Sequence, residues 1–161
     1  MGNRIVVRDG LKLIDPKRAD SYQRTKLKGG EILLCVRGTT GMLAFAAEEL
    51  AGANVTRGIV PLRFDDKKID HHFGFYLLLS PPVQRQIKAA TYGAALMQIN
   101  IRDVKKLTLR FPRLSDQPAI VQKLDALAAK TRRLEAVYQR KLDALAELKQ
   151  SLLQRAFAGE L

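Results

Sequence analysis

The chain has 161 residues, 47% of them hydrophobic, and carries a net charge of +12 from 28 Lys and Arg against 16 Asp and Glu. Its single cysteine excludes an internal disulfide, and no apolar stretch approaches the roughly 20 residues that cross a bilayer. We therefore expect a cytoplasmic protein of about one domain with a modest core, no membrane association and a polyanionic partner, nucleic acid above all.

The N-terminal segment predicts a hairpin. Residues 4–7 and 11–14 are short β-prone runs on either side of Asp9-Gly10, a dipeptide typical of two-residue turns. A polar, turn-rich stretch follows, from residue 15 to residue 30.

Residues 31–64 predict the main strands. Two apolar runs, 31–36 and 42–47, flank the loop sequence RGTTG, so we expect a strand, a tight loop and a second strand. Cys35 lies in the first run and is interpreted as a small buried hydrophobe. Residues 58–64 predict another strand, and Pro61 within it indicates a sheet edge or a bulge.

The periodicity becomes helical at Asp70. One helix is expected from there to Ser80-Pro81, where a capping serine and a proline start a second helix that should stop at Gly93.

Shorter elements are expected after the second helix. The run MQINI predicts a strand, IRDVKK a short helical turn, and LTLRF a last strand that ends at Pro112. Because strands come first and helices later, with little alternation, the fold class is α+β.

A long helix is predicted for the C-terminal part of the chain. Ser115 and Asp116 are capping types, Pro118 fits a first helical turn, and no Gly or Pro follows before Gly159. At 1.5 Å per residue this helix would be roughly 60 Å long. We therefore divide the chain into a globular domain, residues 1–115, and a helical arm, residues 116–161.

The arm carries apolar side chains at alternating spacings of four and three, the pattern of a coiled coil. Such a helix could lie on its own core, but only its first turns could reach a core of this size, so we expect it to pair with another long helix. Thr131 and Lys141 interrupt the pattern, which also includes Ile120. The predicted helix-pairing residues, called the seam below, are Leu124, Leu127, Leu134, Tyr138, Leu145, Leu148 and Leu152.

No pattern in the sequence indicates an enzyme, a cofactor or a metal site. The Asp-His-His run at 70–72 has no further His to complete a ligand set, and solvated residues at a helix start explain it better. The motif SPPV at 80–83 is similar to a methyltransferase motif, but it lacks the aromatic residue and fits a helix start.

The positive charge belongs mainly to the globular part. Residues 1–118 carry a net charge of +9 and residues 119–161 a net charge of +3. Arg and Gln can read base edges, whereas Lys and Thr mostly contact phosphates. Asn54 and Thr56 belong to the same set of polar loop residues. The predicted DNA-binding residues are Arg37, Thr39, Thr40, Arg57, Lys67, Tyr92 and Gln98.

Three blocks of sequence resemble the DNA-specificity subunit of type I restriction–modification systems. The first two are KGGEILLCVRGTTG, with Glu31 where the family has Asp, and the C-terminal LKQSLLQRAFAGEL. The third runs from the second predicted helix into the arm. Its matching residues are Gly93, Asn100-Ile101, Leu107, Pro112, Leu114, Gln117 and Ile120-Val121.

This resemblance implies a non-catalytic subunit that reads half of a bipartite site in double-stranded DNA and docks methyltransferase and restriction subunits. The family's subunit has two recognition domains and two antiparallel spacer helices, whereas this chain has one of each. The resemblance therefore implies a partial or half subunit. Its arm would pair antiparallel with a second helix, which belongs either to another copy of the chain in a homodimer or to a missing half of the subunit.

Two other functions stay open from the residues alone. The chain could be an assembly protein that acts through its arm, or an RNA-binding module that uses the GTTG loop as a backbone contact.

Overall fold

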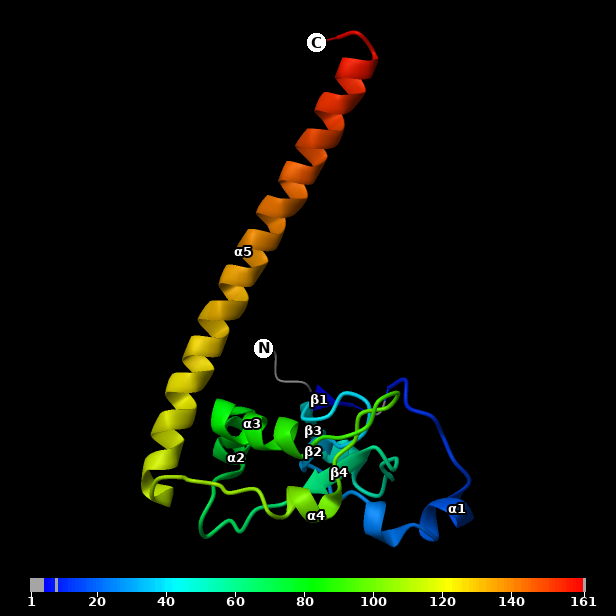
Figure 1. Ribbon diagram of the computed structural model, residues 1–161, viewed down its shortest axis with the longest axis vertical. Helices are drawn as coiled ribbons and strands as arrows, with labels where there is room; N and C mark the ends of the chain where they lie inside the picture. Colours follow the sequence, from blue (N-terminus) through cyan, green and yellow to red (C-terminus); the bar gives the residue numbers. More distant parts are fainter. Residues whose placement is uncertain (1–4, 8, 161) are drawn as a thin grey trace. The chain divides into compact units, whose positions relative to one another are not determined.

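The computed structural model describes residues 5–7 and 9–160. The chain divides into two compact units, one of Asn3–Val121 and one that contains Gln122–Leu161. The fold class is α+β, as predicted (Figure 1). The regular elements are β1 Ile5–Val6, α1 Pro16–Asp20, β2 Ile32–Cys35, β3 Leu43–Ala46, β4 Ile59–Leu62, α2 His71–Leu79, α3 Pro81–Ala90, α4 Ile101–Val104 and α5 Gln117–Phe157, with 3-10 turns at Gln23–Thr25, Glu48–Leu50 and Leu114–Asp116.

The first unit is built on a four-stranded sheet of order β1-β3-β2-β4. β2 pairs antiparallel with β3 and with β4, so the two strands around the RGTTG loop and the third strand are confirmed. Pro61 pairs with Leu33 from the edge strand β4, as its missing N–H requires.

The predicted N-terminal hairpin is wrong. β1 pairs parallel with β3, and residues 11–14 form no strand. Gly10 does turn the chain, with φ of +75°, but Leu13 beyond it is 88% exposed. β1 therefore pairs with β3, which comes later in the chain, and not with the neighbouring segment 11–14. Residue 4 of the predicted run lies outside the described residues.

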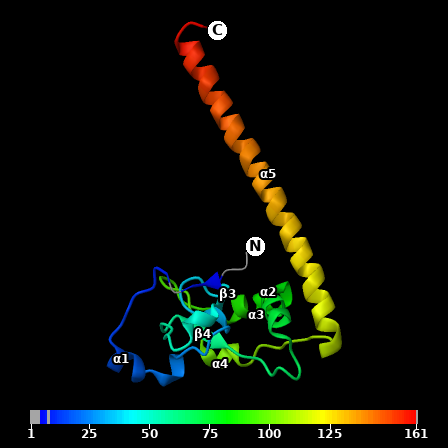
Figure 2. The same ribbon diagram turned by 180° about the vertical axis from the view of Figure 1, so that it is seen from behind.

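The core lies on both faces of β2, because successive side chains of a strand point to opposite faces. Ile32 and Leu34 belong to a large cluster with α2 and α3, which lie beside the sheet (Figures 1 and 2). Leu33 belongs to a smaller cluster with Leu27 and Leu50 on the other face. This explains the unbroken apolar run in the sequence, which has no polar face.

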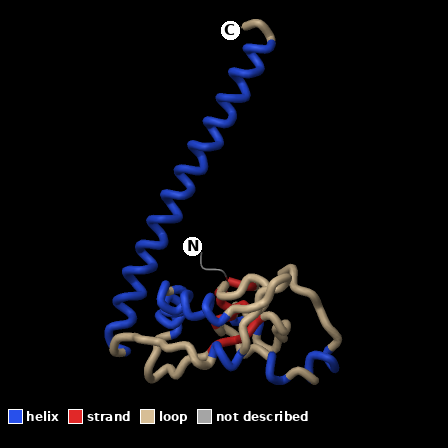
Figure 3. The backbone as a smooth tube through the Cα atoms, in the orientation of Figure 1, coloured by secondary structure: helices blue, strands red, loops and turns tan. Residues whose placement is uncertain are grey.

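Two predicted strands are absent among the described residues. Segment 107–111 is extended and packs Leu107 and Leu109 into the core, but it has no strand partner. The side chain of Gln86 instead accepts from the Thr108 N–H at 2.8 Å and donates to its carbonyl at 3.0 Å. Segment 97–101 makes only isolated bridges. Figure 3 shows how much of this unit is loop.

Two interpretations of single residues also change. Cys35 is half-buried rather than buried, and its thiol lies 3.1 Å from the Arg37 carbonyl oxygen. His71 is not a solvated residue, because it is half-buried with Nε2 2.6 Å from the Gly30 carbonyl oxygen. His72 is exposed, as expected.

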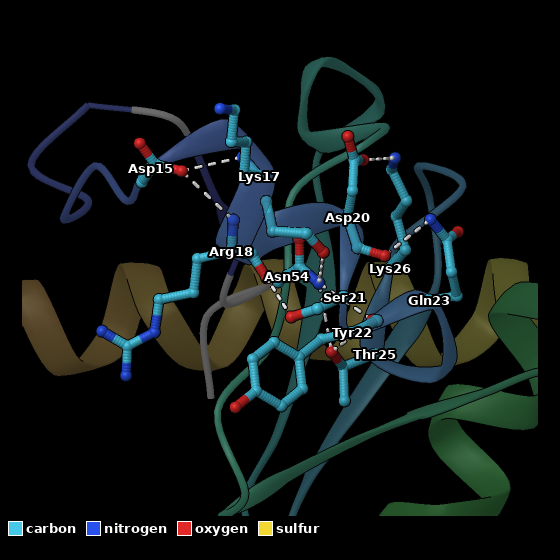
Figure 4. A network of polar contacts seen from close by, with 11 residues as sticks. Asp15, Lys17, Arg18, Asp20, Ser21, Tyr22, Gln23, Thr25, Lys26 and Asn54 are labelled. Carbon is cyan, nitrogen blue, oxygen red and sulfur yellow. Dashed lines mark hydrogen bonds and ion pairs between the residues drawn. The ribbon is translucent and has the colours of Figure 1, made fainter.

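A polar network joins α1 and the turn after it to the loop of Asn54 (Figure 4). The side-chain amide of Asn54 donates to the carbonyls of Ala19 and Tyr22 and to the Thr25 hydroxyl, at 3.0–3.2 Å. Asp15 caps the helix by accepting from two backbone amides of its first turn. The amide nitrogen of Asn54 is thus engaged within the protein, and its contact with DNA stays a prediction.

The second unit is the greater part of α5, and the predicted long helix is confirmed. The helix ends before Gly159, which has φ of +73°. Six of the seven seam residues are exposed, between 43% and 62%, and Leu124 is half-buried. Within the described residues, no helix is long and apolar enough to cross a membrane.

Candidate nucleic-acid interface

A surface hollow of about 410 Å³ brings together four of the seven residues predicted to contact DNA. These four are Arg37, Arg57, Tyr92 and Gln98, which come from three separate loops of the sequence. The full lining is Val36, Arg37, Arg57, Tyr92, Gln98, Ile99, Asn100, Ile101 and Arg102, and we call it the first hollow.

Backbone pairing places these residues side by side. Gln98 lies in isolated antiparallel bridges with Arg37 on one side and Tyr92 on the other. The Gly38 N–H donates to the Met97 carbonyl at 2.8 Å, and the Ile99 N–H donates to the Val36 carbonyl at 3.0 Å. Segment 36–38 is therefore joined to segment 97–99 by a short ribbon of hydrogen bonds.

Two further contacts complete this arrangement. The Val36 N–H donates to the Gly58 carbonyl at 2.7 Å, which brings the loop of Arg57 beside Arg37. Gly93 turns the 92–98 loop with φ of +111°, and a Cβ there would collide with the Leu96 carbonyl oxygen. Only glycine fits this turn without strain, so it fixes how Tyr92 faces Gln98.

The first hollow is cationic. Three arginines line it, at positions 37, 57 and 102, and none of the described residues that line it is acidic. No ion pair within residues 5–7 and 9–160 engages any of these arginines. The Tyr92 hydroxyl donates to Oδ1 of Asn100 at 3.3 Å, which leaves the Asn100 amide group as a donor beside the ring. Such a surface suits a ligand with both negative charge and flat, hydrogen-bonding edges.

The sequence prediction missed Arg102 and Asn100 as members of this surface. Asn100 appears in the sequence analysis only as a residue that matches the family, and its side chain makes no capping hydrogen bond to α4. The basic run at residues 102–106 was the available signal.

The other three predicted residues lie elsewhere. Thr39 is exposed on the RGTTG loop, with its hydroxyl 3.4 Å from the Cys35 sulfur. Thr40 lines a different hollow, and its hydroxyl lies 3.2 Å from the Thr91 hydroxyl. Lys67 is exposed on the turn before α2, where its N–H donates to Asp65. Their contact with DNA stays a prediction.

The described residues offer no group of three His, Cys, Asp or Glu side chains that could hold a metal ion. The first hollow presents arginine, amide and phenol groups, which can offer positive charge and hydrogen bonds to a ligand.

These features define a protein that belongs to the type I restriction–modification DNA specificity domain family, whose model matches residues 10–143. The resemblance inferred from the sequence is thereby confirmed.

Two curated relatives carry the same assignment in their names. The chain is 27% identical over 140 residues to the EcoBI type I restriction enzyme specificity subunit of Escherichia coli, covering 87% of this chain and 29% of the relative. It is 31% identical over 96 residues to the EcoDI specificity subunit of the same species, covering 60% and 22%. The chain thus spans less than a third of the length of either relative.

Two solved structures share the fold. One is the type I restriction–modification S subunit of M. genitalium, with 25% identity and a TM-score of 0.51, covering 67% of this chain and 28% of that one. The other is the HsdS subunit of Thermoanaerobacter tengcongensis, with 23% identity and a TM-score of 0.57, covering 83% and 34%.

Proposed function

We propose that this chain is a non-catalytic, sequence-specific DNA-recognition module of a type I restriction–modification assembly. The first hollow is the proposed surface for double-stranded DNA. Because DNA is the ligand, we place this activity in the cytoplasm. The methyltransferase and restriction subunits of the same system are the proposed partners, as membership in the family implies.

One observation carries the proposal: residues distant in sequence converge on one cationic hollow. Three arginines supply positive charge without an acidic neighbour in the described lining. Gln98 and Asn100 supply amides of the kind that pair with adenine, and arginine pairs with guanine. A surface made for charge alone would need no amides and no aromatic ring, so this mixture favours base reading over simple attraction to phosphate.

The helical arm supports a second part of the proposal, namely antiparallel pairing with another long helix. Leu145, Leu148 and Leu152 form a largely apolar strip along one face of the helix. The Thr131 hydroxyl donates to the Leu127 carbonyl at 3.1 Å, and Lys141 lies 5.5 Å from the centre of the Tyr138 ring. Thr131 and Lys141, the two polar residues that interrupt the seam, therefore have partners within the same helix. The leucines of the seam remain exposed.

The test is a comparison of Arg37→Ala with Lys67→Ala on selected and scrambled DNA. A 30-base-pair duplex is first selected from a random pool by the unaltered protein. Arg37→Ala should weaken binding to the selected duplex by about 1–3 kcal/mol and binding to a scrambled duplex by less. Lys67 lies outside the first hollow, so Lys67→Ala should leave the ratio of the affinities for the selected and scrambled duplexes unchanged.

Other outcomes decide between the proposed function and its alternatives. Equal losses on both duplexes would make Arg37 a phosphate contact. A preference for single-stranded RNA over duplex DNA would favour the RNA-binding alternative. Helix-mediated association without measurable affinity for any nucleic acid would favour the assembly protein.

A further inference from the structure

A second hollow, of about 430 Å³, lies on the other side of the RGTTG loop. It is lined by Thr40 and Met97, whereas the neighbouring positions Arg37 and Gln98 line the first hollow. The paired segments 37–41 and 97–98 therefore form a ridge with a hollow on each side. We call these two segments the ridge.

The second hollow is also cationic. Its far wall is α3, which contributes Arg85 and Lys88, both exposed. No acidic side chain is among the described residues that line it. Neither cation takes part in an ion pair within the described part of the chain. Unlike the first hollow, it presents no free amide, because its glutamine is already bonded to backbone.

That glutamine, Gln84, holds α3 against the ridge. Its amide donates to the Leu78 carbonyl at 2.8 Å and to the Gly41 carbonyl at 3.2 Å. The Thr91 hydroxyl, just after α3, donates to the Ile87 carbonyl at 2.7 Å and lies at hydrogen-bonding distance, 3.2 Å, from the Thr40 hydroxyl. The ridge is thus fixed to α3 at two points, and the spacing between Arg85 and the ridge cannot vary freely.

We propose that the ridge enters the major groove of DNA and that Arg85 and Lys88 bind phosphates of the strand that borders the groove on the second hollow's side. This inference rests on the proposed function and adds a docking mode to it. The major groove, about 12 Å wide, accepts two paired extended segments. The two segments of the ridge are paired by the Arg37–Gln98 bridge and by the hydrogen bond from the Gly38 N–H to the Met97 carbonyl. Phosphate contacts beside a base-reading element fix its register on the duplex.

The division of roles follows from the chemistry on each side. The first hollow has amides and an aromatic ring that can distinguish bases, whereas the second offers two cations, which bind phosphate oxygens. Both hollows lie against the same ridge, so a phosphate held by α3 adds affinity for every sequence, while Arg37 and Gln98 decide which bases are preferred.

The test is the salt dependence of DNA binding by the full chain with Arg85→Gln and Lys88→Gln combined. Each phosphate neutralised on a duplex contributes about 0.9 to the slope of log affinity against log salt. The double variant should therefore have a slope smaller by about 2, so that between 50 and 200 mM salt it loses about tenfold less affinity than the unaltered protein. The ratio of affinities for the selected and scrambled duplexes should stay the same.

The matched control is Arg132→Gln with Arg133→Gln, which removes the same charge from exposed positions of α5. An unchanged slope for the α3 variant, or an equal decrease in the α5 control, would overturn the inference and leave DNA recognition intact. A loss of selectivity in the α3 variant would overturn it too, because Arg85 and Lys88 would then read bases. If the unaltered protein binds no duplex, the proposed function itself fails.

A second arm tests the groove. Replacing guanine by 7-deazaguanine removes an acceptor that faces only the major groove. The unaltered protein should bind the substituted selected duplex at least several-fold more weakly. Equal binding to both duplexes, together with competition by a minor-groove ligand such as netropsin, would show that the protein binds the minor groove. That result would contradict the proposed entry of the ridge into the major groove.

Discussion

The side-chain carbonyl of Gln117 accepts a hydrogen bond from the backbone N–H of Asp70 at 2.7 Å, across 47 positions of the sequence. Its amide group donates to the carbonyls of Lys68 at 2.9 Å and of Pro112 at 3.0 Å. Gln117 is the first residue of α5 and is fully buried. Its side chain alone provides hydrogen-bond partners for three backbone groups from two loops.

Replacing Gln117 by Ala should destabilise the first unit by about 2–4 kcal/mol, because each buried backbone group left without a partner costs about 1–3 kcal/mol and water can recover part of this. The measurement is urea unfolding followed by near-ultraviolet circular dichroism. Gln122→Ala, an exposed glutamine on the same helix, is the control and should change stability by less than about 0.5 kcal/mol. Equal effects of the two substitutions would show that the buried bonds contribute nothing.

Gly74 lies inside α2, where Ala normally stabilises a helix by about 1 kcal/mol relative to Gly. Here the opposite is expected. A Cβ at this position would lie 2.6 Å from a ring carbon of Phe64 and 3.3 Å from Ile69. Gly74→Ala should therefore lower the free energy of unfolding by about 1–2 kcal/mol through overpacking.

A double-mutant cycle checks the cause. In a Phe64→Leu background the crowding ring is gone, so adding Gly74→Ala should cost less than it does in the unaltered protein. If the cost is the same in both backgrounds, the Phe64 contact is not the reason.

Glu31 is 3% exposed and accepts hydrogen bonds from the backbone amides of Lys28 and Gly29, at 2.6 and 2.9 Å, and from the guanidinium of Arg63. Burial alone would raise the pKa of its carboxyl, but the Lys28 amide and Arg63 outweigh burial and hold the pKa below the ordinary value of 4.5. A lowered pKa means that the ionised carboxylate stabilises the folded chain above about pH 4.5 and that this stability is lost as the pH falls further.

Glu31→Gln should therefore lower the free energy of unfolding by about 1–2 kcal/mol at pH 7. The expected loss is this small because Arg63 is half-exposed and solvent screens its ion pair with Glu31. The difference between variant and unaltered protein should shrink as the pH drops below 4.5. Thermal unfolding at a series of pH values measures it. Glu147→Gln, exposed on α5, is the control. A difference that is constant from pH 7 to pH 3 would contradict the assignment.

Leu134→Asp combined with Leu145→Asp places charges in the exposed seam of α5 and should abolish pairing of the arm. Sedimentation velocity of the full chain should then report a single chain where the unaltered protein is paired. Ala136→Asp with Gln150→Asp introduces the same charges on the opposite face of the helix and should leave the mass unchanged. If the seam variant keeps the mass of the unaltered protein, or the opposite-face variant loses it, the seam is not the pairing surface.

Periodicity and turn chemistry predicted much of the fold because they act locally. The strands around the RGTTG loop, the edge strand with Pro61, the helices before and after Ser80 and the long helix all follow from residue spacing and breakers. Where a prediction failed, a partner from elsewhere in the chain had decided the outcome. Gln86 bonds the backbone of Thr108 in place of a neighbouring strand, so a segment with strand periodicity stays a single extended chain.

The candidate site shows the same division. Composition and resemblance selected Arg37, Arg57, Tyr92 and Gln98 as separate loop residues, but nothing in their spacing indicates that they share one hollow. Their meeting depends on backbone pairing between residues about sixty positions apart, and only that pairing adds Arg102. It equally assigns Asn54, which resembles the other candidates in sequence, to the support of α1.

The sequence by itself determined the excess of positive charge, the long helix with its apolar seam, and the family to which the chain belongs, because these depend on residues and their near neighbours. The tertiary structure alone decided that the ridge separates two cationic hollows and that Gln117, the first residue of α5, bonds the backbone of two loops. Long-range hydrogen bonds in a packed interior fix these relationships, and no local pattern in the chain encodes which distant groups will bond.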